Sequence, residues 1–475
     1  MPPTLADLWK ALGTGSCAAE ETAALPFVDV VVDSRLAAEG SLFVALRGEQ
    51  TDGHLFVGDA FRKGARAALV ERRVDDCAKL VDVREELPSP LTVAEGICFL
   101  VPDALKGLQC LAAHWRRQHA QCHVVGITGS VGKTTTKELI AAVLSRHFTT
   151  LKSLGNYNNE IGLPLTMLRI HPGVQWVVQE MGMYALGEIA ELAEIAVPEI
   201  GVVTNVGPTH LERLGAIESI AQAKAELVQA LPPDGLAVLN GDDERVRDMA
   251  TLTSAKRVLF YGLQPHNDLW ADEVETRGLE GLWMRFHYRD QSVHAKLPIL
   301  GRHSAYGALA AAAVGLSLGL AWEEIILGLR DKTAQLRLMV VPGMRGTTIV
   351  DDTYNASPDS TSAALNLLAE LNGRKVAVLG DMLELGSYEV EGHRLVGRRA
   401  ADVVAILVTV GDLGRLIAEE ALRVGMPASA VHAVKDNDEA VRVLDSVLAE
   451  GDLVLVKGSR GMAMENVVAE LARGD

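Results

Sequence analysis

Aromatic side chains are scarce in this sequence, at 4% of its 475 residues, whereas hydrophobic residues as a whole make up 48%. Alanine, valine, leucine and glycine must therefore fill the interior. Small residues let helices lie close on a sheet, so this balance favours layered α/β structure. The chain is too long for one hydrophobic core, and we expect about three domains.

The sequence also lacks a long basic run, and its formal net charge is −17. Because nucleic-acid binding needs clustered lysine and arginine, we expect no nucleic-acid partner. No apolar run reaches the roughly 18 residues of a membrane-spanning helix. The nearest, 308–320, is rich in alanine and glycine and predicts a packed helix. We therefore expect a protein that is not integral to a membrane.

Cysteine is rare, and no pair of cysteines has the CxxC spacing of a redox or metal motif. The odd number, the size of the chain and the lack of a secretory signal predict reduced thiols in a cytoplasmic protein. The five cysteines are Cys17, Cys77, Cys98, Cys110 and Cys122.

Apolar runs divide the chain into three parts. Residues 1–105 hold short runs separated by glycine, aspartate and proline, which predict a small α/β domain. In 106–330, apolar strands alternate with turns and helices, which indicates a parallel sheet, and alternation over 264–298 predicts antiparallel strands at one edge. Residues 331–475 repeat the parallel pattern. The predicted central and C-terminal strands are 124–128, 176–179, 200–205, 236–240, 375–379, 405–410 and 453–456.

A glycine-rich turn, 128–136, joins the first central strand to a helix over about 134–146. Glycines let backbone N–H groups point at phosphate oxygens, and the helix N-terminus adds partial positive charge. We expect Gly129, Ser130 and Gly132 to shape this loop and Lys133 to reach the β- and γ-phosphates. Thr134 or Thr135 would place a hydroxyl on Mg²⁺.

The loop is not a strict GxxxxGK motif, because Ile127 stands where that motif needs glycine. An ordinary strand–helix turn is the alternative interpretation. The Gly-Lys-Thr sequence in this strand–helix context favours a phosphate loop.

The shortened loop resembles that of the Mur ligases, and segments along nearly the whole chain support the match. Two of them, 351–358 and 379–386, look most like the members that add D-alanyl-D-alanine. The matching segments are 33–35, 42–48, 51–54, 156–162, 204–210, 351–358, 379–386 and 456–461.

This resemblance implies a UDP-substrate domain, a central P-loop ATPase domain and a C-terminal Rossmann-like domain. It implies an ADP-producing ligase of peptidoglycan synthesis that acts as a monomer on UDP-N-acetylmuramoyl-tripeptide and D-Ala-D-Ala. The tripeptide carboxylate would attack the γ-phosphate of ATP, and the dipeptide amine would then attack the acyl-phosphate. Such chemistry needs alignment and charge neutralisation more than covalent help from the protein.

Several acidic and basic residues are candidates for a site with two Mg²⁺ ions. Glu180 follows an apolar strand, and a carboxylate there suits Mg²⁺, although a solvated loop carboxylate is the alternative. The resemblance implies that His210 ligates or orients a second Mg²⁺, although a lone histidine is more often structural. It also implies that Arg337 contacts the γ-phosphate and that Asp352 lies near the ribose, with a surface charge pair as the alternative.

Lys224 lies on a predicted helix, 217–231, four residues after Ile220 and three before Leu227, so it shares the inward face. Its side chain either snorkels outward or is buried, and burial would lower its pKa. The resemblance implies a carbamylated Lys224 that ligates the second Mg²⁺ beside His210.

The remaining candidates come from the matched segments. The resemblance implies that Asn205 helps to bind the nucleotide, and that Lys457 and Arg460 hold a substrate carboxylate. One segment departs from the family pattern, which often shows His-Asn-x-x-Asn with the last Asn at the adenine. Here Ser304 and Gly307 replace both asparagines. The other expected substrate-binding residues are Ser34, Arg35, Thr51, Asp52, His54, Asn156, Asn355 and Glu384.

Two other functions compete with this interpretation. A ligase similar to folylpolyglutamate synthase would lack the N-terminal UDP-binding segments, which are present. A regulatory nucleotide-binding module without chemistry would have lost Lys133, Glu180, His210 or Lys224, and all four are present. The sequence leaves open whether residue three of the tripeptide is diaminopimelate or lysine.

Overall fold

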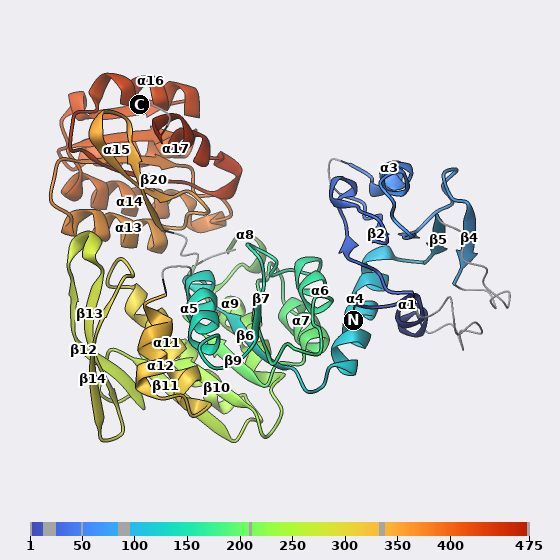
Figure 1. Cartoon of the computed structure of the whole chain (residues 1–475). Coiled ribbons are helices and arrows are strands. Elements are labelled where there is room, and N and C mark those ends of the chain that lie inside the picture. Colours follow the sequence, from blue (N-terminus) through green and yellow to red (C-terminus); the bar gives the residue numbers. More distant parts are fainter. Residues whose placement is uncertain are drawn as a thin grey trace.

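The computed structural model describes residues 2–12, 25–48, 51–83, 96–208, 211–331 and 338–472. They form three sheets that follow one another along the chain, each with its own helices (Figure 1). The predicted α/β class with three units is therefore confirmed. Across these ranges, no helix combines the length and apolarity needed to cross a membrane.

The first sheet has five strands in the order β1-β2-β3-β5-β4, and all its pairings are parallel. Its strands are short because glycine, aspartate and proline interrupt the apolar runs. The elements of this unit are α1 (Leu5–Ala11), β1 (Val30–Val31), β2 (Leu42–Val44), α3 (Val57–Arg62), β3 (Ala67–Val70), β4 (Lys79–Asp82) and β5 (Ile97–Leu100).

The cysteines of this first sheet differ from the expectation of reduced thiols. Cys77 and Cys98 form a disulfide, with their Cα atoms 5.9 Å apart. This separation lies within the range that a disulfide can span. The pairing arises because β4 runs beside β5 and brings together residues 21 positions apart in sequence, which spacing alone does not reveal. Cys110 and Cys122 are free, and Cys17 lies outside the described residues.

Helix α4 (Ala104–Gln118) joins the first unit to the second. It packs against α1 on one side and against α6 (Gly162–Met167) and α7 (Glu188–Ala196) on the other. Two long side chains fix it to the second unit: the Trp115 indole donates to Ile170 O at 2.9 Å, and Arg116 Nε donates to Ala196 O at 2.8 Å. As a result, one hydrophobic core runs without a break from Leu5 to Ala255.

The second sheet has nine strands in the order β14-β13-β12-β11-β10-β9-β6-β8-β7. The expected antiparallel edge is confirmed, because β12 pairs antiparallel with β13 and β13 with β14. The strands are β6 (His123–Thr128), β7 (Thr150–Lys152), β8 (Trp176–Glu180), β9 (Ile200–Val203), β10 (Leu236–Asn240), β11 (Arg257–Gly262), β12 (Leu269–Thr276), β13 (Leu282–Tyr288) and β14 (Gln291–Leu297).

Helices cover both faces of the central sheet, and the strand period of two explains why. Val124 belongs to the core under α4 and α9, whereas its neighbour Val125 belongs to the core under α5, α11 and α12. Strands buried on both faces read as continuous apolar runs, as the sequence shows. The remaining helices of this unit are α5 (Lys133–Leu144), α8 (Leu211–Leu214), α9 (Ile217–Gln229), α10 (Glu244–Asp248), α11 (Ser304–Ser317) and α12 (Trp322–Leu329).

The third sheet has six strands in the order β15-β16-β20-β17-β18-β19. Its two cores contain buried residues of this unit alone. The elements are β15 (Met339–Gly343), β16 (Thr347–Asp352), α13 (Pro358–Glu370), β17 (Lys375–Gly380), α14 (Glu389–Val403), β18 (Ile406–Val410), α15 (Gly414–Arg423), β19 (Val431–Val434), α16 (Asn437–Val447), β20 (Leu453–Lys457) and α17 (Glu465–Ala472).

In Figure 1 the third unit lies at the upper left, above the central unit, and the first unit lies at the upper right. Helix α8 of the central unit packs on the 3₁₀ turn η6 (Gly386–Tyr388) of the third. In an open parallel sheet, ligands bind at the carboxyl ends of the strands. The two units therefore face each other across the region where a nucleotide would bind.

Candidate active site

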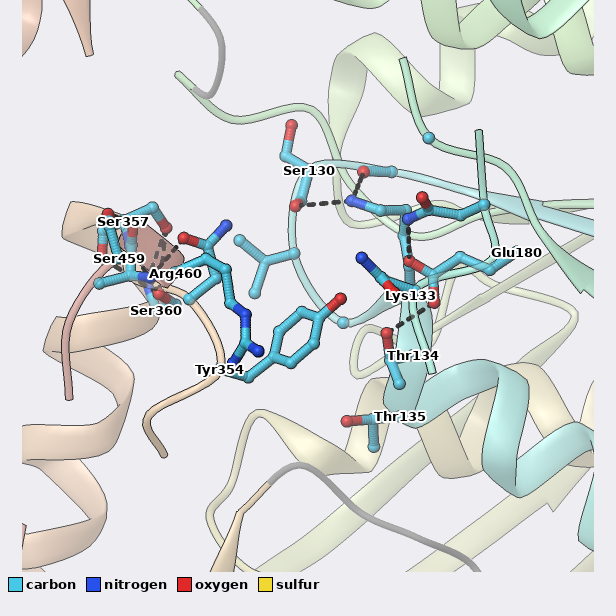
Figure 2. A pocket seen from close by; sticks show the side chains of 18 of the residues that line it. Ser130, Lys133, Thr134, Thr135, Glu180, Tyr354, Ser357, Ser360, Ser459 and Arg460 are labelled. Carbon is cyan, nitrogen blue, oxygen red and sulfur yellow. Dashed lines mark hydrogen bonds between the residues drawn. The ribbon is translucent and has the colours of Figure 1, made fainter. Parts of the chain in front are cut away.

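A cleft of about 330 Å³ lies between the central and C-terminal units. The phosphate loop and the carboxyl end of β8 form one wall, and the ends of β16, β17 and β20 form the other (Figure 2). The cleft brings together most of the residues predicted for nucleotide, metal and dipeptide. These are Gly129, Ser130, Gly132, Lys133, Thr134, Thr135, Asn156, Glu180, Lys224, Asp352, Asn355, Glu384, Lys457 and Arg460.

The phosphate loop has the conformation that its glycines predict. Gly129 and Gly132 have φ values of 144° and 86°, which side chains disfavour. A Cβ on Gly129 would overlap the Thr204 hydroxyl, whereas the space beside Gly132 is open. The Lys133 ammonium donates to Gly129 O at 2.7 Å and to Ser130 O at 3.2 Å, so its charge lies directly over the loop.

Asn205 braces the loop and does not line the cleft. Its side-chain oxygen accepts from Val131 N–H at 2.9 Å, and its amide donates to Val131 O at 2.9 Å. The Ser130 hydroxyl also accepts from Gly207 N–H at 2.8 Å. These bonds tie the turn after β9 to the phosphate loop, so Asn205 acts on the nucleotide site through the backbone of Val131.

Glu180 is buried at the end of β8, and both of its carboxylate oxygens are engaged. The Thr134 hydroxyl donates to one at 2.6 Å, and the Asn158 amide donates to the other at 2.9 Å (Figure 2). A carboxylate beside a hydroxyl at the start of a phosphate-binding helix forms a hard oxygen donor set, which fits Mg²⁺.

Lys224 lines the same cleft and is 2% exposed, which confirms its predicted inward position on α9. Burial lowers the pKa of Lys224 well below the ordinary lysine value, and the charge of Lys133 lowers it further. Among the described residues, none accepts a hydrogen bond from its amine. The predicted partner His210 lies outside the described residues, as does Arg337.

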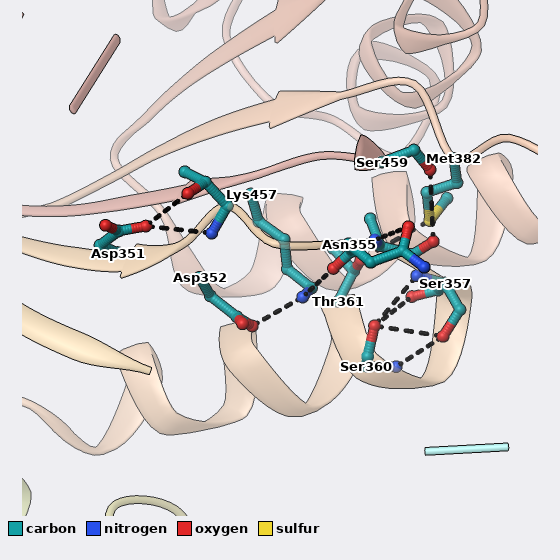
Figure 3. A network of polar contacts seen from close by, with 11 residues as sticks. Asp351, Asp352, Asn355, Ser357, Ser360, Thr361, Met382, Lys457 and Ser459 are labelled. Carbon is teal, nitrogen blue, oxygen red and sulfur yellow. Dashed lines mark hydrogen bonds and ion pairs between the residues drawn. The ribbon is translucent and has the colours of Figure 1, made fainter. Parts of the chain in front are cut away.

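The C-terminal wall contains a buried ion pair. Lys457 Nζ lies 2.6 Å from Asp352 Oδ2 and also donates to Asn355 O at 2.8 Å (Figure 3). This pair joins the end of β16 to the end of β20. Arg460, by contrast, is exposed and pairs with Glu465 at 2.9 Å. Of the two cations predicted to hold a substrate carboxylate, Lys457 is thus already paired within the protein.

The structure adds cleft residues that the sequence reasoning did not single out. Tyr354 extends from the C-terminal wall toward the phosphate loop, while Ser357 and Ser360 lie beside it at the start of α13 (Figure 2). Tyr354 lies within the matched segment 351–358, so its aromatic ring in that segment could have marked it as a site residue. Nearby, Glu384 has a φ of 65°, a strained conformation for a residue other than glycine.

The segment that departs from the family pattern lies at one end of the cleft. Leu300, His303 and Ser304 line the cleft there with Leu338. Burial lowers the pKa of His303, and the charge of Asp352 partly offsets this effect. Gly307 packs on α5 instead, where a Cβ would lie 3.3 Å from Leu139 Cδ1.

The residues predicted to bind the UDP end do not line this cleft. His54 is buried: its Nδ1 lies 2.6 Å from Asp52 Oδ1, and its Nε2 accepts from Glu71 N–H at 2.8 Å. His54 therefore stabilises the 3₁₀ turn that begins after Asp52. Arg35 is exposed and pairs with Asp33 at 2.7 Å. Ser34 and Thr51 belong to the same small unit.

Family comparisons agree with this arrangement. Residues 28–87 match the Mur ligase family catalytic domain, 127–315 the Mur ligase middle domain, and 336–460 the Mur ligase glutamate ligase domain. A Bacillus subtilis relative, named UDP-N-acetylmuramoyl-tripeptide–D-alanyl-D-alanine ligase, is 37% identical over 93% of this chain and 92% of its own length. This chain belongs to the Mur ligase family. An Escherichia coli relative of the same name is 35% identical over 93% of each chain.

Solved structures of this family have the same architecture. MurF from Acinetobacter baumannii superposes with a TM-score of 0.84 at 31% identity, covering 100% of this chain and 99% of that one. MurF from Thermotoga maritima, solved in complex with ADP, has a TM-score of 0.77 at 29% identity, covering 94% and 98%. Folylpolyglutamate synthase from Mycobacterium tuberculosis shares the fold alone, with a TM-score of 0.61 at 17% identity over 77% of this chain.

The two loop glycines give a matched test of the phosphate loop. Gly129→Ala should abolish nucleotide binding and lower turnover by about 10²-fold or more, because its Cβ would push Thr204 and the loop apart. The Cβ of Gly132→Ala would meet no atom within 4 Å, so this variant should lose only the roughly 1–3 kcal/mol of stability that backbone strain costs. Calorimetric titration with ADP and thermal unfolding measure both effects. Wild-type ADP affinity in Gly129→Ala would contradict this account of the loop.

Proposed function

We propose that this chain is an ATP-dependent ligase that adds D-alanyl-D-alanine to UDP-N-acetylmuramoyl-tripeptide through an acyl-phosphate, in peptidoglycan precursor synthesis. The observation that carries the proposal is the cleft, in which a phosphate loop faces the strand ends of a second α/β unit. The names of the relatives supply the substrates. An amide-forming ligase must hold nucleotide, acid and amine together, and a cleft between two units can do so.

The phosphate loop accounts for the first chemical step. Backbone N–H groups at the start of α5 and the Lys133 ammonium would neutralise the β- and γ-phosphates of ATP. The tripeptide carboxylate then attacks the γ-phosphorus, and ADP leaves. Attack by the dipeptide amine on the acyl carbon forms the amide bond and releases phosphate.

We assign the first Mg²⁺ to the Thr134 hydroxyl and the Glu180 carboxylate, with Thr135 beside them. When bound, Mg²⁺ supplies positive charge to the phosphate oxygens and helps to align them. Asn158 holds the second oxygen of Glu180, so the carboxylate keeps its orientation in the cleft. In this assignment, the nucleotide also contacts Gly129, Ser130 and Gly132.

We assign a second Mg²⁺ to His210 and to a carbamate on Lys224. Burial lowers the pKa of the Lys224 amine, which favours its neutral form, and a neutral amine adds CO₂ to give a carbamate. The amine nitrogen bonds to the CO₂ carbon and loses a proton to solvent, so a neutral amine becomes an anionic oxygen ligand. The position of Lys224 in the cleft, near the charge of Lys133, supports this assignment.

The C-terminal unit completes the site in this proposal. Asp352 would bind the nucleotide ribose, and Arg337 would contact the γ-phosphate when the two units close. Asn156 would contact the tripeptide, and Asn355 and Glu384 the dipeptide. Because Lys457 is paired with Asp352, Arg460 is the better candidate for the dipeptide carboxylate.

The three units have separate tasks under this proposal. Residues 1–105 bind the UDP end through Ser34, Arg35, Thr51, Asp52 and His54, residues 106–330 bind ATP, and residues 331–475 bind the dipeptide. A single chain contains all three units, so we propose a monomer. ATP and nucleotide-linked precursors are cytoplasmic metabolites, and we place the reaction in the cytoplasm.

Substrate omission tests the proposed reaction directly. ATP-dependent phosphate release should require both UDP-N-acetylmuramoyl-tripeptide and D-Ala-D-Ala, and should fall to background when either is left out. Product mass should increase by one dipeptide. Nucleotide binding without phosphate release would instead indicate a regulatory module, and activity with a folate and glutamate would indicate the folylpolyglutamate synthase class.

Removal of the loop cation should stop catalysis without unfolding the protein. Lys133→Ala should lower kcat by about 10²–10³-fold, or roughly 3–4 kcal/mol of transition-state stabilisation. The exposed Lys256 of the same unit provides a control, and Lys256→Ala should keep wild-type rates. Steady-state phosphate release and far-ultraviolet circular dichroism check both variants. Normal turnover by Lys133→Ala would mean that ATP binds elsewhere.

The carbamate predicts a chemical signature at Lys224. Lys224→Ala should lose most activity, and a short carboxylate additive should restore part of it. Lys224→Arg keeps a long basic side chain but cannot form the carbamate, so it should be equally inactive. Mass spectrometry near neutral pH should show a CO₂-sized adduct on Lys224, and ¹³C-labelled bicarbonate should give a carbamate signal. An active Lys224→Ala variant, with an outward ammonium in a nucleotide-bound crystal, would refute the assignment.

A further inference from the structure

One fully buried charge lies just outside the cleft and has no part in the proposed chemistry. Lys137, on the first turns of α5, is 0% exposed, and its neighbour Glu138 is 3% exposed. A buried ion pair often contributes less to stability than an apolar pair of the same size, because both charges lose their hydration. Stability alone is therefore a weak reason for a lysine at this position.

The hydrogen bonds of Lys137 point to a different task. Its ammonium donates to Ser153 O at 2.8 Å and to Gly155 O at 3.5 Å, and it lies 3.1 Å from Glu138 Oε1. An ammonium has three donors, and these partners use all of them. Two of the three are backbone carbonyls of one loop, 153–159, which follows β7.

That loop in turn holds the carboxylate assigned to Mg²⁺. The Asn158 amide donates to Glu180 Oε1 at 2.9 Å, and the Ser153 hydroxyl accepts from Glu180 N–H at 3.3 Å. Gln179 Nε2 donates to Tyr157 O at 2.8 Å, which fixes the middle of the loop to β8. A continuous chain of bonds therefore runs from Lys137 through the loop to both the backbone and the carboxylate of Glu180.

We propose that Lys137 is a positioning residue, which anchors loop 153–159 to the phosphate-binding helix and so sets the orientation of Glu180 for Mg²⁺. The inference rests on the proposed function, since it takes Glu180 as a metal ligand. Lys133 and Lys137 share one helix, so the anchor keeps the metal ligand and the phosphate loop in a fixed relation. Partners that orient metal ligands typically contribute about 10–100-fold to metal affinity or activity.

Lys152 provides a matched control. It pairs with the same carboxylate, Glu138, from the neighbouring strand β7, but it contacts neither loop carbonyl. Its side chain is 34% exposed. Lys152→Met therefore removes a charge from the cluster and leaves the anchor intact, whereas Lys137→Met removes the anchor and keeps the bulk of the side chain.

The experiment compares the full-length wild type with Lys137→Met and Lys152→Met. Calorimetric titration with ADP at graded magnesium concentrations should show that Lys137→Met needs about 10–100-fold more Mg²⁺ for half-maximal affinity. Hydrogen exchange should be faster over 153–159 in Lys137→Met and unchanged over α9. The KM for UDP-tripeptide should move less than kcat, and Lys152→Met should match the wild type in every measurement.

A third variant keeps the inference testable if Lys137→Met folds poorly. Asn158→Ala keeps the buried Lys137–Glu138 pair and removes the hydrogen bond from Asn158 to the Glu180 carboxylate. It should therefore show the same shift in magnesium dependence. An unshifted magnesium dependence in either folded variant would overturn the inference. If the wild type bound ADP without any magnesium dependence, the assignment of Glu180 would fail first, and the role of Lys137 with it.

Discussion

A carboxylate without access to water, Glu180, constrains the arrangement of the central unit. Burying an ionised carboxyl group is costly unless hydrogen bonds or cations replace its hydration. Here the hydroxyl of Thr134 and the amide of Asn158 supply two of those bonds. The two donors come from the helix after β6 and the loop after β7, and Glu180 itself ends β8. The phosphate loop, loop 153–159 and the ends of β6, β7 and β8 must therefore keep fixed positions relative to one another.

The opposite wall of the cleft also contains a buried charged group, which in this case is a cation. Lys457 is 2% exposed; Asp352 neutralises its charge, and the carbonyl of Asn355 accepts a hydrogen bond from its ammonium. This arrangement fixes the ends of β16 and β20 against each other, and Asp352 is held on the cleft surface. Each wall thus contains one buried charge whose partners come from separate elements. Each wall is therefore held by contacts of its own, separate from those of the other wall.

Much of the fold could be predicted from the sequence, because strands buried on both faces give uninterrupted apolar runs. The predicted strand 236–240 coincides with β10, and Lys224 was placed correctly on the inward face of its helix. Pairings between distant residues could not be predicted. The Cys77–Cys98 disulfide depends on the alignment of β4 with β5, and the partner of Lys457 lies 105 positions away.

Some side chains have structural contacts that residue type alone did not predict. His54 belongs to a matched substrate-binding segment, and its ring also links Asp52 to the backbone of Glu71. No sequence motif pointed to Lys137, because its partners in loop 153–159 are backbone carbonyls, which every residue type provides. Proposed roles for His210 and Arg337 rest on family resemblance, because both lie outside the described residues.

The core that runs unbroken from Leu5 to Ala255 has a consequence for substrate choice. The first and central units cannot separate without exposing it to water, so they behave as one body joined through α4. The third unit has two cores of its own, and it meets the central unit through Leu300 and through the contact of α8 with η6. If the first unit binds the UDP end as proposed, this shared core sets the distance between that site and the phosphate loop. Under the proposed function, a peptide stem one residue shorter would hold its carboxylate farther from the phosphate loop.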